Sequence, residues 1–245
     1  LNQFSITVEG KLVDATGKAR KRPLELLKVL IALGGRQIEQ SRVHELLWPD
    51  AEGDTAVQAL HTTLHRLRKL IGEQTITLQN GYINIDPRFT WVDVWSLERL
   101  FKLLSPQLRL VPSAANIQKV SDLSDKILLL YQGEFLESEA EHTWVRPYRQ
   151  KLSGRFKQIL VELGTFWQRA SDWERAIACY QQGLALDPLA EELYQQLIQA
   201  FQKADRPTEA AATFQLCRKN LSDGLGTSPS PKTVALYKSI RPEMV

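Results

Sequence analysis

The chain has 245 residues, 43% of them hydrophobic and 24% charged, a composition typical of folded globular proteins and a length that predicts one large domain or two ordinary ones. No apolar run reaches the roughly 20 residues that span a bilayer, and residues 1–8 lack the pattern of a signal peptide, so neither membrane insertion nor export is expected. The 31 basic and 28 acidic side chains give a formal net charge of only +3, so overall charge alone does not identify a nucleic-acid-binding protein.

The first 50 residues predict a small sheet and two helices. Alternating apolar and polar residues at 4–8, a Glu9–Gly10 turn and residues 11–13 predict two short strands. The first helix is expected to begin near Pro23, which a first helical turn tolerates, and to end at Gly34–Gly35. Ser41 is the expected N-cap of a second helix, which Pro49 ends.

A third helix and a hairpin follow. The helix is expected from about Thr55 to Ile71, with Gly72 as its stop. Asn80–Gly81 then joins two alternating runs, at residues 75–78 and 82–85, and this dipeptide is the strongest short signal for a two-residue hairpin turn. A short helix, a second helix and a hairpin in this order are typical of a winged helix-turn-helix.

From Val92 onward the pattern is helical, with loops expected near Pro106, Pro112, Gly133 and Pro147. A set of residues between 160 and 188 recurs 34 residues later, between 194 and 222. This is the period of tetratricopeptide repeats, in which small residues let paired helices approach and aromatic residues fill the space between them. Two repeats cannot bury their faces alone, so the helices between residues 95 and 155 are expected to continue the stack.

The third helix has two chemically different faces. Its leucines and Ile71 recur at helical spacing and predict a buried seam, whereas Gln58, Thr62, Arg66 and Lys69 lie opposite. No acidic residue occurs from 55 to 72. A polar, cationic face without carboxylates is suited to meet an anion. The alternative interpretation is an ordinary solvated face. Arg68 lies close to the seam, so a structural ion pair is expected for it rather than a base contact.

Several motifs in order carry a family resemblance. The first part of the chain resembles the OmpR-type winged helix, and the remainder is similar to the bacterial transcriptional activator domain (BTAD) that follows it in the antibiotic regulatory protein (SARP) family. The matching stretches are residues 46–49, 64–72 and 81–85 in the first part, and 131–136, 144–146, 186–194 and 225–231 in the second. The predicted fold is therefore mainly α with a small β part, divided into a winged helix at 1–91 and a tetratricopeptide-like repeat domain at 92–245.

The resemblance implies a cytoplasmic bacterial transcription activator. Its winged helix would bind direct repeats in promoter double-stranded DNA, and its helical domain would support a homodimer and contact RNA polymerase. The DNA-binding positions that it implies are Gln58, His61, Thr62, His65, Arg66 and Lys69 on the helix and Asn80, Gly81 and Tyr82 in the wing. Further possible phosphate contacts are Lys21, Arg22, Ser41, Arg42 and Thr55, and the first two belong to a basic cluster at 18–22 that could equally be a solvated loop.

Other functions have weaker support in the sequence. The main alternative is a protein-interaction module in which the repeats bind a partner and the winged helix does not read DNA. No enzyme motif is present, and no cofactor is expected. His61 and His65 have a spacing that could ligate a metal, but no Cys or carboxylate accompanies them on the helix, so no metal site is expected. Cys179 and Cys217 are expected to act as small hydrophobic residues, with a redox switch as the alternative.

Overall fold

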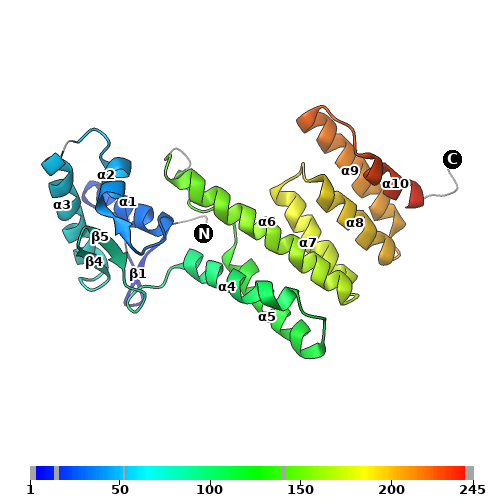
Figure 1. Cartoon of the computed structure of the whole chain (residues 1–245), viewed down its shortest axis with the longest axis horizontal. Helices are drawn as coiled ribbons and strands as arrows, with labels where there is room; N and C mark the ends of the chain where they lie inside the picture. The colour runs from blue at the N-terminus through cyan, green and yellow to red at the C-terminus, as the bar shows by residue number, and fades with distance from the viewer. Residues whose placement is uncertain (1–3, 14–16, 52, 140–141, 241–245) are drawn as a thin grey trace. The chain divides into compact units, whose positions relative to one another are not determined.

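The computed structural model describes residues 4–13, 17–51, 53–139 and 142–240, and there the protein is mainly helical with two small antiparallel sheets (Figure 1). This confirms the predicted class. The elements up to residue 85 are β1 (Thr7–Val8), β2 (Lys11–Leu12), α1 (Lys18–Ala32), β3 (Ile38–Glu39), α2 (Gln40–Leu47), α3 (Gly53–Ile71), β4 (Ile76–Gln79) and β5 (Tyr82–Ile85). After them come α4 (Asp93–Leu108), α5 (Ala114–Leu130), the 3-10 helix η1 (Glu137–Glu139), α6 (Val145–Arg169), α7 (Trp173–Leu186), α8 (Glu191–Lys203), α9 (Pro207–Leu225) and α10 (Pro231–Ile240).

The predicted starts of the first two helices were wrong. α1 begins at Lys18, so Pro23 lies inside it and not at its first turn. Proline has no backbone N–H, so its presence removes only one backbone hydrogen bond, and that bond lies close to the helix end. α2 begins at Gln40 with Glu39 as its N-cap, so Ser41 is already helical and cannot cap. Pairing of β3 with β5 holds Glu39 extended, and the helix starts directly after it.

The predicted hairpin of β4 and β5 is confirmed, and it belongs to a three-stranded sheet of order β3-β5-β4. Gln79 pairs with Tyr82 across the turn, and Ile38 of β3 pairs with Ile83. Asn80 has a φ of 51° and Gly81 a φ of 79°, the left-handed conformations that a two-residue type I′ turn requires. Ile83 and Ile85 are buried whereas Tyr82 between the turn and Ile83 is exposed, so the sheet buries one face.

Of the four loops expected after residue 92, the two at Pro106 and Pro147 are helical in the structure. Pro106 lies inside α4 near its C-terminal end, and Pro147 is the third residue of α6. A proline in the first turn of a helix lacks only an N–H that has no intrahelical acceptor, so Pro147 fits there without cost. Pro112 and Gly133 do lie between helices, as expected.

The helix pairs that follow one another from residue 154 to 225 pack as the 34-residue period predicts. A Cβ atom on Gly164 would lie 2.4 Å from a ring atom of Tyr180, and one on Gly183 would lie 2.9 Å from Leu193. Tyr180 is fully buried. The glycines therefore let α6 approach α7 and α7 approach α8. In the next repeat Cys217 stands at the position of Gly183 and is itself buried.

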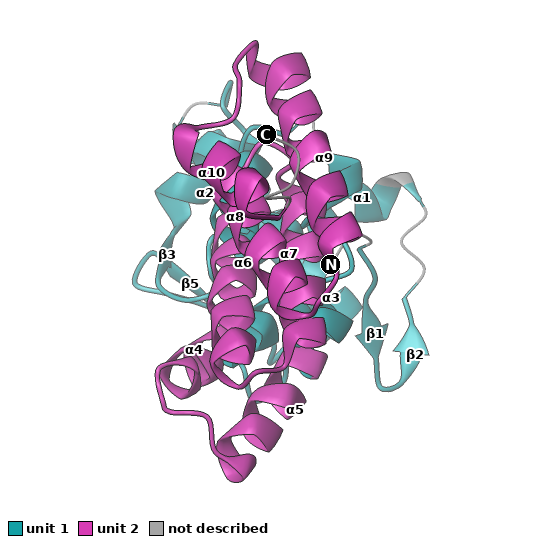
Figure 2. Ribbon diagram, turned by 90° about the vertical axis from the view of Figure 1, so that its right-hand side faces the viewer, with its two compact units in different colours: residues 1–100, 126–153 teal, residues 101–125, 154–245 magenta. Residues whose placement is uncertain are grey.

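Two compact units make up the chain (Figure 2). Residues 1–100 and 126–153 form one, called here the N-terminal unit, and residues 101–125 and 154–245 form the other, the C-terminal unit. Residues 101–125 thus group with the repeats, whereas residues 126–153 group with the β-containing part. The division predicted between residues 91 and 92 stays a prediction. None of the helices in the described part of the chain has the length and apolar character of a membrane span.

Candidate nucleic-acid interface

Helix α3 separates its residues into a packed face and a solvent face. Leu60, Leu64 and Leu67 are almost completely buried, and Thr63 is buried with its hydroxyl donating to the Ala59 carbonyl at 2.7 Å. The six predicted helix positions all lie exposed: Gln58, His61, Thr62, His65, Arg66 and Lys69. The amphipathic spacing read from the sequence therefore gives the correct orientation of the helix.

Arg66 and Lys69 form no ion pair with any residue that the structure describes. The helix begins two residues earlier than expected, at Gly53, so that it includes Asp54 in its first turn. A carboxylate there stabilises the positive end of the helix dipole. From Thr55 to the end of the helix the face remains free of acidic residues, and its two exposed cations stay available to an outside anion.

Arg68 has a structural role, but not the expected ion pair. Its Nε donates a hydrogen bond to the backbone carbonyl oxygen of Ile76 at 2.9 Å. Ile76 is the first residue of β4 and is buried. Arg68 therefore fixes the end of α3 to the base of the hairpin.

The hairpin turn and the start of α2 lie together. Gln40, the first residue of α2, donates its backbone N–H to the Gly81 carbonyl oxygen at 2.9 Å, and Glu39 pairs with Tyr82. Asn80 and Tyr82 are exposed and Gly81 is half-buried, and the candidate phosphate contacts Ser41 and Arg42 are exposed in the first turn of α2. The structure thus brings the wing candidates and these two residues into one neighbourhood.

The sequence did not reveal this connection because β3 has only two residues, too few for a periodic pattern. A turn precedes this strand, where Gln37 has a φ of 51°. Its backbone N–H donates to Oδ1 of Asn84 on β5 at 2.7 Å. A polar residue in the middle of an otherwise apolar strand, such as Asn84, can indicate such a contact.

The remaining candidate phosphate contacts are also exposed: Lys21, Arg22 and Thr55. Arg22 donates to Glu25 at 2.9 Å on the same helix, so a phosphate would have to replace that carboxylate. Two acidic residues precede α3 in the sequence: Asp50, which is exposed, and Glu52, which lies outside the described residues.

His44 of α2 is half-buried and feels the charge of His61 on α3. Burial, and secondly the charge of His61, lower the pKa of His44 below its ordinary value. The lowered pKa favours the neutral form of His44. In the described part of the chain no group of three or more His, Cys, Asp or Glu side chains converges as a metal site requires.

The two cysteines are poor candidates for redox chemistry. Both are free thiols. Burial raises the pKa of Cys217 to about 11 and that of Cys179 to about 12. Because the thiolate is the reactive form, both thiols are weak nucleophiles at neutral pH.

Comparison with known proteins gives concordant matches. A family model described as "Bacterial transcriptional activator domain" matches residues 92–241. The regulatory protein AfsR of Streptomyces griseus is 24% identical over 237 residues, which cover 94% of this chain and 23% of AfsR. The transcriptional regulator RedD of Streptomyces coelicolor is 26% identical over 214 residues, which cover 83% of this chain and 59% of RedD.

A solved structure is also similar. It is that of Mycobacterium tuberculosis EmbR in complex with a low affinity phosphopeptide, with a TM-score of 0.72 and 19% identity, covering 98% of this chain and 63% of that one. At this identity the likeness shows the fold alone. The chain spans about a quarter of AfsR and about three fifths of RedD and of the EmbR structure.

Proposed function

Because this chain belongs to the bacterial transcriptional activator domain family of SARP-type regulators, we propose that it regulates transcription by binding double-stranded promoter DNA. In this proposal residues 1–91 are an OmpR-type winged helix, with α3 as the recognition helix in the major groove and the β4–β5 hairpin as the wing. Residues 92–245 are the tetratricopeptide-like activator domain. The curated relatives are regulatory proteins, not enzymes, which supports a role other than catalysis.

One observation carries the DNA-binding proposal. The solvent face of α3 is polar and cationic, free of carboxylates from Thr55 onward, and its cations Arg66 and Lys69 have no partner among the described residues. A helix of this kind that stands beside a hairpin is suited to enter the major groove of an anionic duplex. The start of α2, joined to the hairpin turn by the Gln40–Gly81 hydrogen bond, adds Ser41 and Arg42.

The side chains suit different tasks on DNA. Arg66 can present two donors to guanine, and Gln58 can pair with adenine, each worth about 1–3 kcal/mol of discrimination. Thr62 suits a thymine methyl group. Lys69, Arg42, Lys21 and Arg22 suit phosphates, which position a protein without reading sequence.

The helical domain is proposed to mediate dimerisation or contact with RNA polymerase, so that binding activates transcription. Some of its charged residues pair with one another, as Lys157 with Asp187 at 2.9 Å, and exposed apolar side chains offer a surface to a partner. Leu216 and Leu225 on α9 are 50% and 57% exposed. These exposed leucines also favour the second candidate function, a protein-interaction module that does not read DNA.

Selection of bound sequences from random duplexes tests the proposal. A recovered direct repeat is expected, with affinity that falls steeply as salt rises. Arg66→Ala should relax the selected sequence, whereas Lys69→Ala should weaken all sequences alike. Arg218→Ala, which removes an exposed arginine of α9, is the matched control. Binding that is absent, or unaffected by salt, would exclude DNA reading and leave the protein-interaction module.

A further inference from the structure

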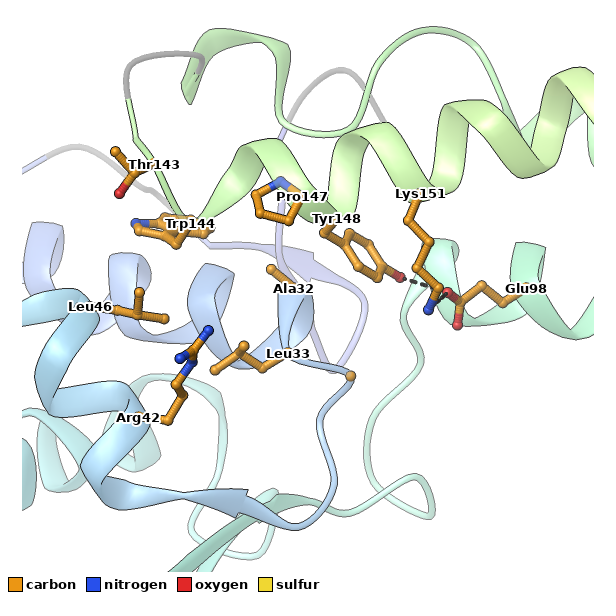
Figure 3. A pocket seen from close by; sticks show the side chains of 11 residues that line it. Ala32, Leu33, Arg42, Leu46, Glu98, Thr143, Trp144, Pro147, Tyr148 and Lys151 are labelled. Atoms are coloured by element: carbon orange, nitrogen blue, oxygen red, sulfur yellow. Dashed lines mark hydrogen bonds and ion pairs between the residues drawn. The ribbon is translucent and has the colours of Figure 1, made fainter.

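A pocket of about 430 Å³ lies inside the N-terminal unit, between the end of α1, α2, α4 and the start of α6. Figure 3 shows Trp144 and Pro147 on one side of it, with Ala32 and Leu33 opposite. Its walls are thus apolar and aromatic. Its volume falls within the range of about 300–1,000 Å³ typical of small-molecule sites, which combine such walls with a few polar groups.

The charged lining residues lie at two ends of the pocket (Figure 3). At one end the Tyr148 hydroxyl donates to Glu98 at 3.3 Å, and the Lys151 ammonium lies 3.5 Å from the same carboxylate. The charges of Lys151 and Glu98 balance there. Glu98 is the sole acidic residue among those that line the pocket.

Arg42 stands at the other end without a carboxylate among the lining residues. Its partner is Glu45, at 3.7 Å, and both side chains are more than half exposed. An exposed pair at this distance is weak and exchanges readily. The pocket therefore has a net positive charge that is concentrated at its Arg42 end.

Trp144 contributes its ring to the apolar wall. The residue is only 9% exposed, and its indole N–H has no hydrogen-bond partner among the described residues. A buried donor without an acceptor is unfavourable.

We propose that this pocket binds a small organic acid, with a flat apolar body between the Pro147 and Leu33 walls and its anionic group at Arg42. The positive charge of Arg42 favours a ligand with an anionic group, and the apolar walls favour a ligand with a flat apolar body. Arg42 is also a candidate phosphate contact, so an occupied pocket would compete with DNA. This last step rests on the proposed function, whereas ligand binding itself does not.

Two fluorescent probes test the pocket on the full chain without DNA. These are 8-anilinonaphthalene-1-sulfonate and N-phenyl-1-naphthylamine, which has the same rings but no anionic group. The sulfonate is expected to bind saturably at one site and about tenfold more tightly than the neutral probe, as one added charge-assisted contact predicts. Arg42→Gln should remove this difference, and Ala32→Phe, which fills the pocket, should weaken both probes while circular dichroism stays unchanged.

Lys126→Gln, at an exposed position of the same unit outside the pocket, is the matched control and should bind both probes as the wild type does. Equal affinity of the two probes, or an unchanged sulfonate affinity in Arg42→Gln, would overturn the proposal. With duplex DNA present, the sulfonate should lower the DNA affinity of the wild type. If the sulfonate binds as expected but does not lower the DNA affinity, the competition is refuted while ligand binding in the pocket stands.

Discussion

The cations on the solvent face of α3 have different surroundings from Arg175 and Arg206 of the C-terminal unit. In the C-terminal unit Arg206 lies 3.1 Å from Glu174 and 2.8 Å from Glu209, and Arg175 lies 3.4 Å from Asp172. On α3 of the N-terminal unit, Arg66 and Lys69 face solvent without a carboxylate partner in the described structure. A cation that is held by a carboxylate belongs to the fold, whereas one without a partner is available to an external anion. Nearly neutral overall charge is compatible with DNA binding for this reason.

The largest effect is expected from reversing the charge of the α3 face. The double variant Arg66→Glu, Lys69→Glu should lose more than about 100-fold in affinity for duplex DNA at moderate salt, because two attractions to phosphate or base become repulsions. Fluorescence anisotropy with a labelled duplex measures this. The matched control is Arg218→Glu, Lys219→Glu on α9, where both residues are exposed. A comparable loss in the control would contradict the distinction between the two regions.

The next effect concerns packing in the C-terminal unit. Gly164→Ala and Gly154→Ala make the same change on the same helix α6, but a Cβ at 164 would lie 2.4 Å from the buried Tyr180 ring whereas nothing lies within 4 Å of one at 154. Gly154→Ala should be neutral or stabilising because alanine favours helix. Gly164→Ala should lower the free energy of unfolding by about 2 kcal/mol. Urea denaturation measures both, and equal stability of the two variants would refute the role assigned to Gly164.

Sequence patterns predicted the fold well where a pattern was long. The seam of α3 and the Asn80–Gly81 turn were predicted because helical spacing and a turn dipeptide reflect local physics. The start of α1 and the start of α2 were not, because Pro23 and Ser41 are compatible with several positions near a helix end. Contacts with other parts of the chain decide which of these positions is the helix start. One such contact is the pairing of β3, a strand that is too short to predict from the sequence.

The candidate site was predictable in its exposed residues and unpredictable in its connections. Exposure of Gln58 or Arg66 follows from the angle around the helix. The hydrogen bond of Gln40 to Gly81, and that of Arg68 to the Ile76 carbonyl, join segments through backbone groups. Every residue carries such groups, so the sequence gives no sign of which pair will meet.

Arg68 and Lys69 are neighbours on α3 with different expected roles, Arg68 in stability and Lys69 in DNA binding. Arg68→Met should lower the free energy of unfolding by about 1 kcal/mol because the Ile76 carbonyl loses a charged donor. Lys69→Met should leave stability unchanged and reduce the slope of log affinity against log salt by about 1. Urea denaturation and salt titrations of DNA binding measure the two. A stability loss in Lys69→Met as large as that in Arg68→Met would show that Lys69 too belongs to the fold.

The smallest effect concerns an acidic group that belongs to the fold of the C-terminal unit. Glu191 accepts a hydrogen bond from the Ser230 backbone N–H at 2.7 Å and another from the hydroxyl of the fully buried Thr233. Burial acts to raise the pKa of Glu191, but the hydrogen bonds from Thr233, Ser230 and Gln195 outweigh it and lower the pKa below 4.5. The ionised form is therefore favoured by folding. Its stabilisation is present above the ordinary glutamate pKa and is lost as the pH falls through the lowered value.

The matched variant Glu191→Gln isolates this contribution from the acid dependence of the other carboxylates. Between about pH 6 and about pH 3.5 the stability difference between the wild type and Glu191→Gln should shrink by a few tenths of a kcal/mol to about 1 kcal/mol, measured by urea denaturation at each pH. DNA affinity at neutral pH should be the same in both proteins, because Glu191 belongs to the C-terminal unit and not to the unit that contains α3. A stability difference that stays constant with pH would mean that Glu191 is not preferentially ionised in the folded protein. An altered DNA affinity would mean that charged residues of the C-terminal unit also contribute to the DNA interface.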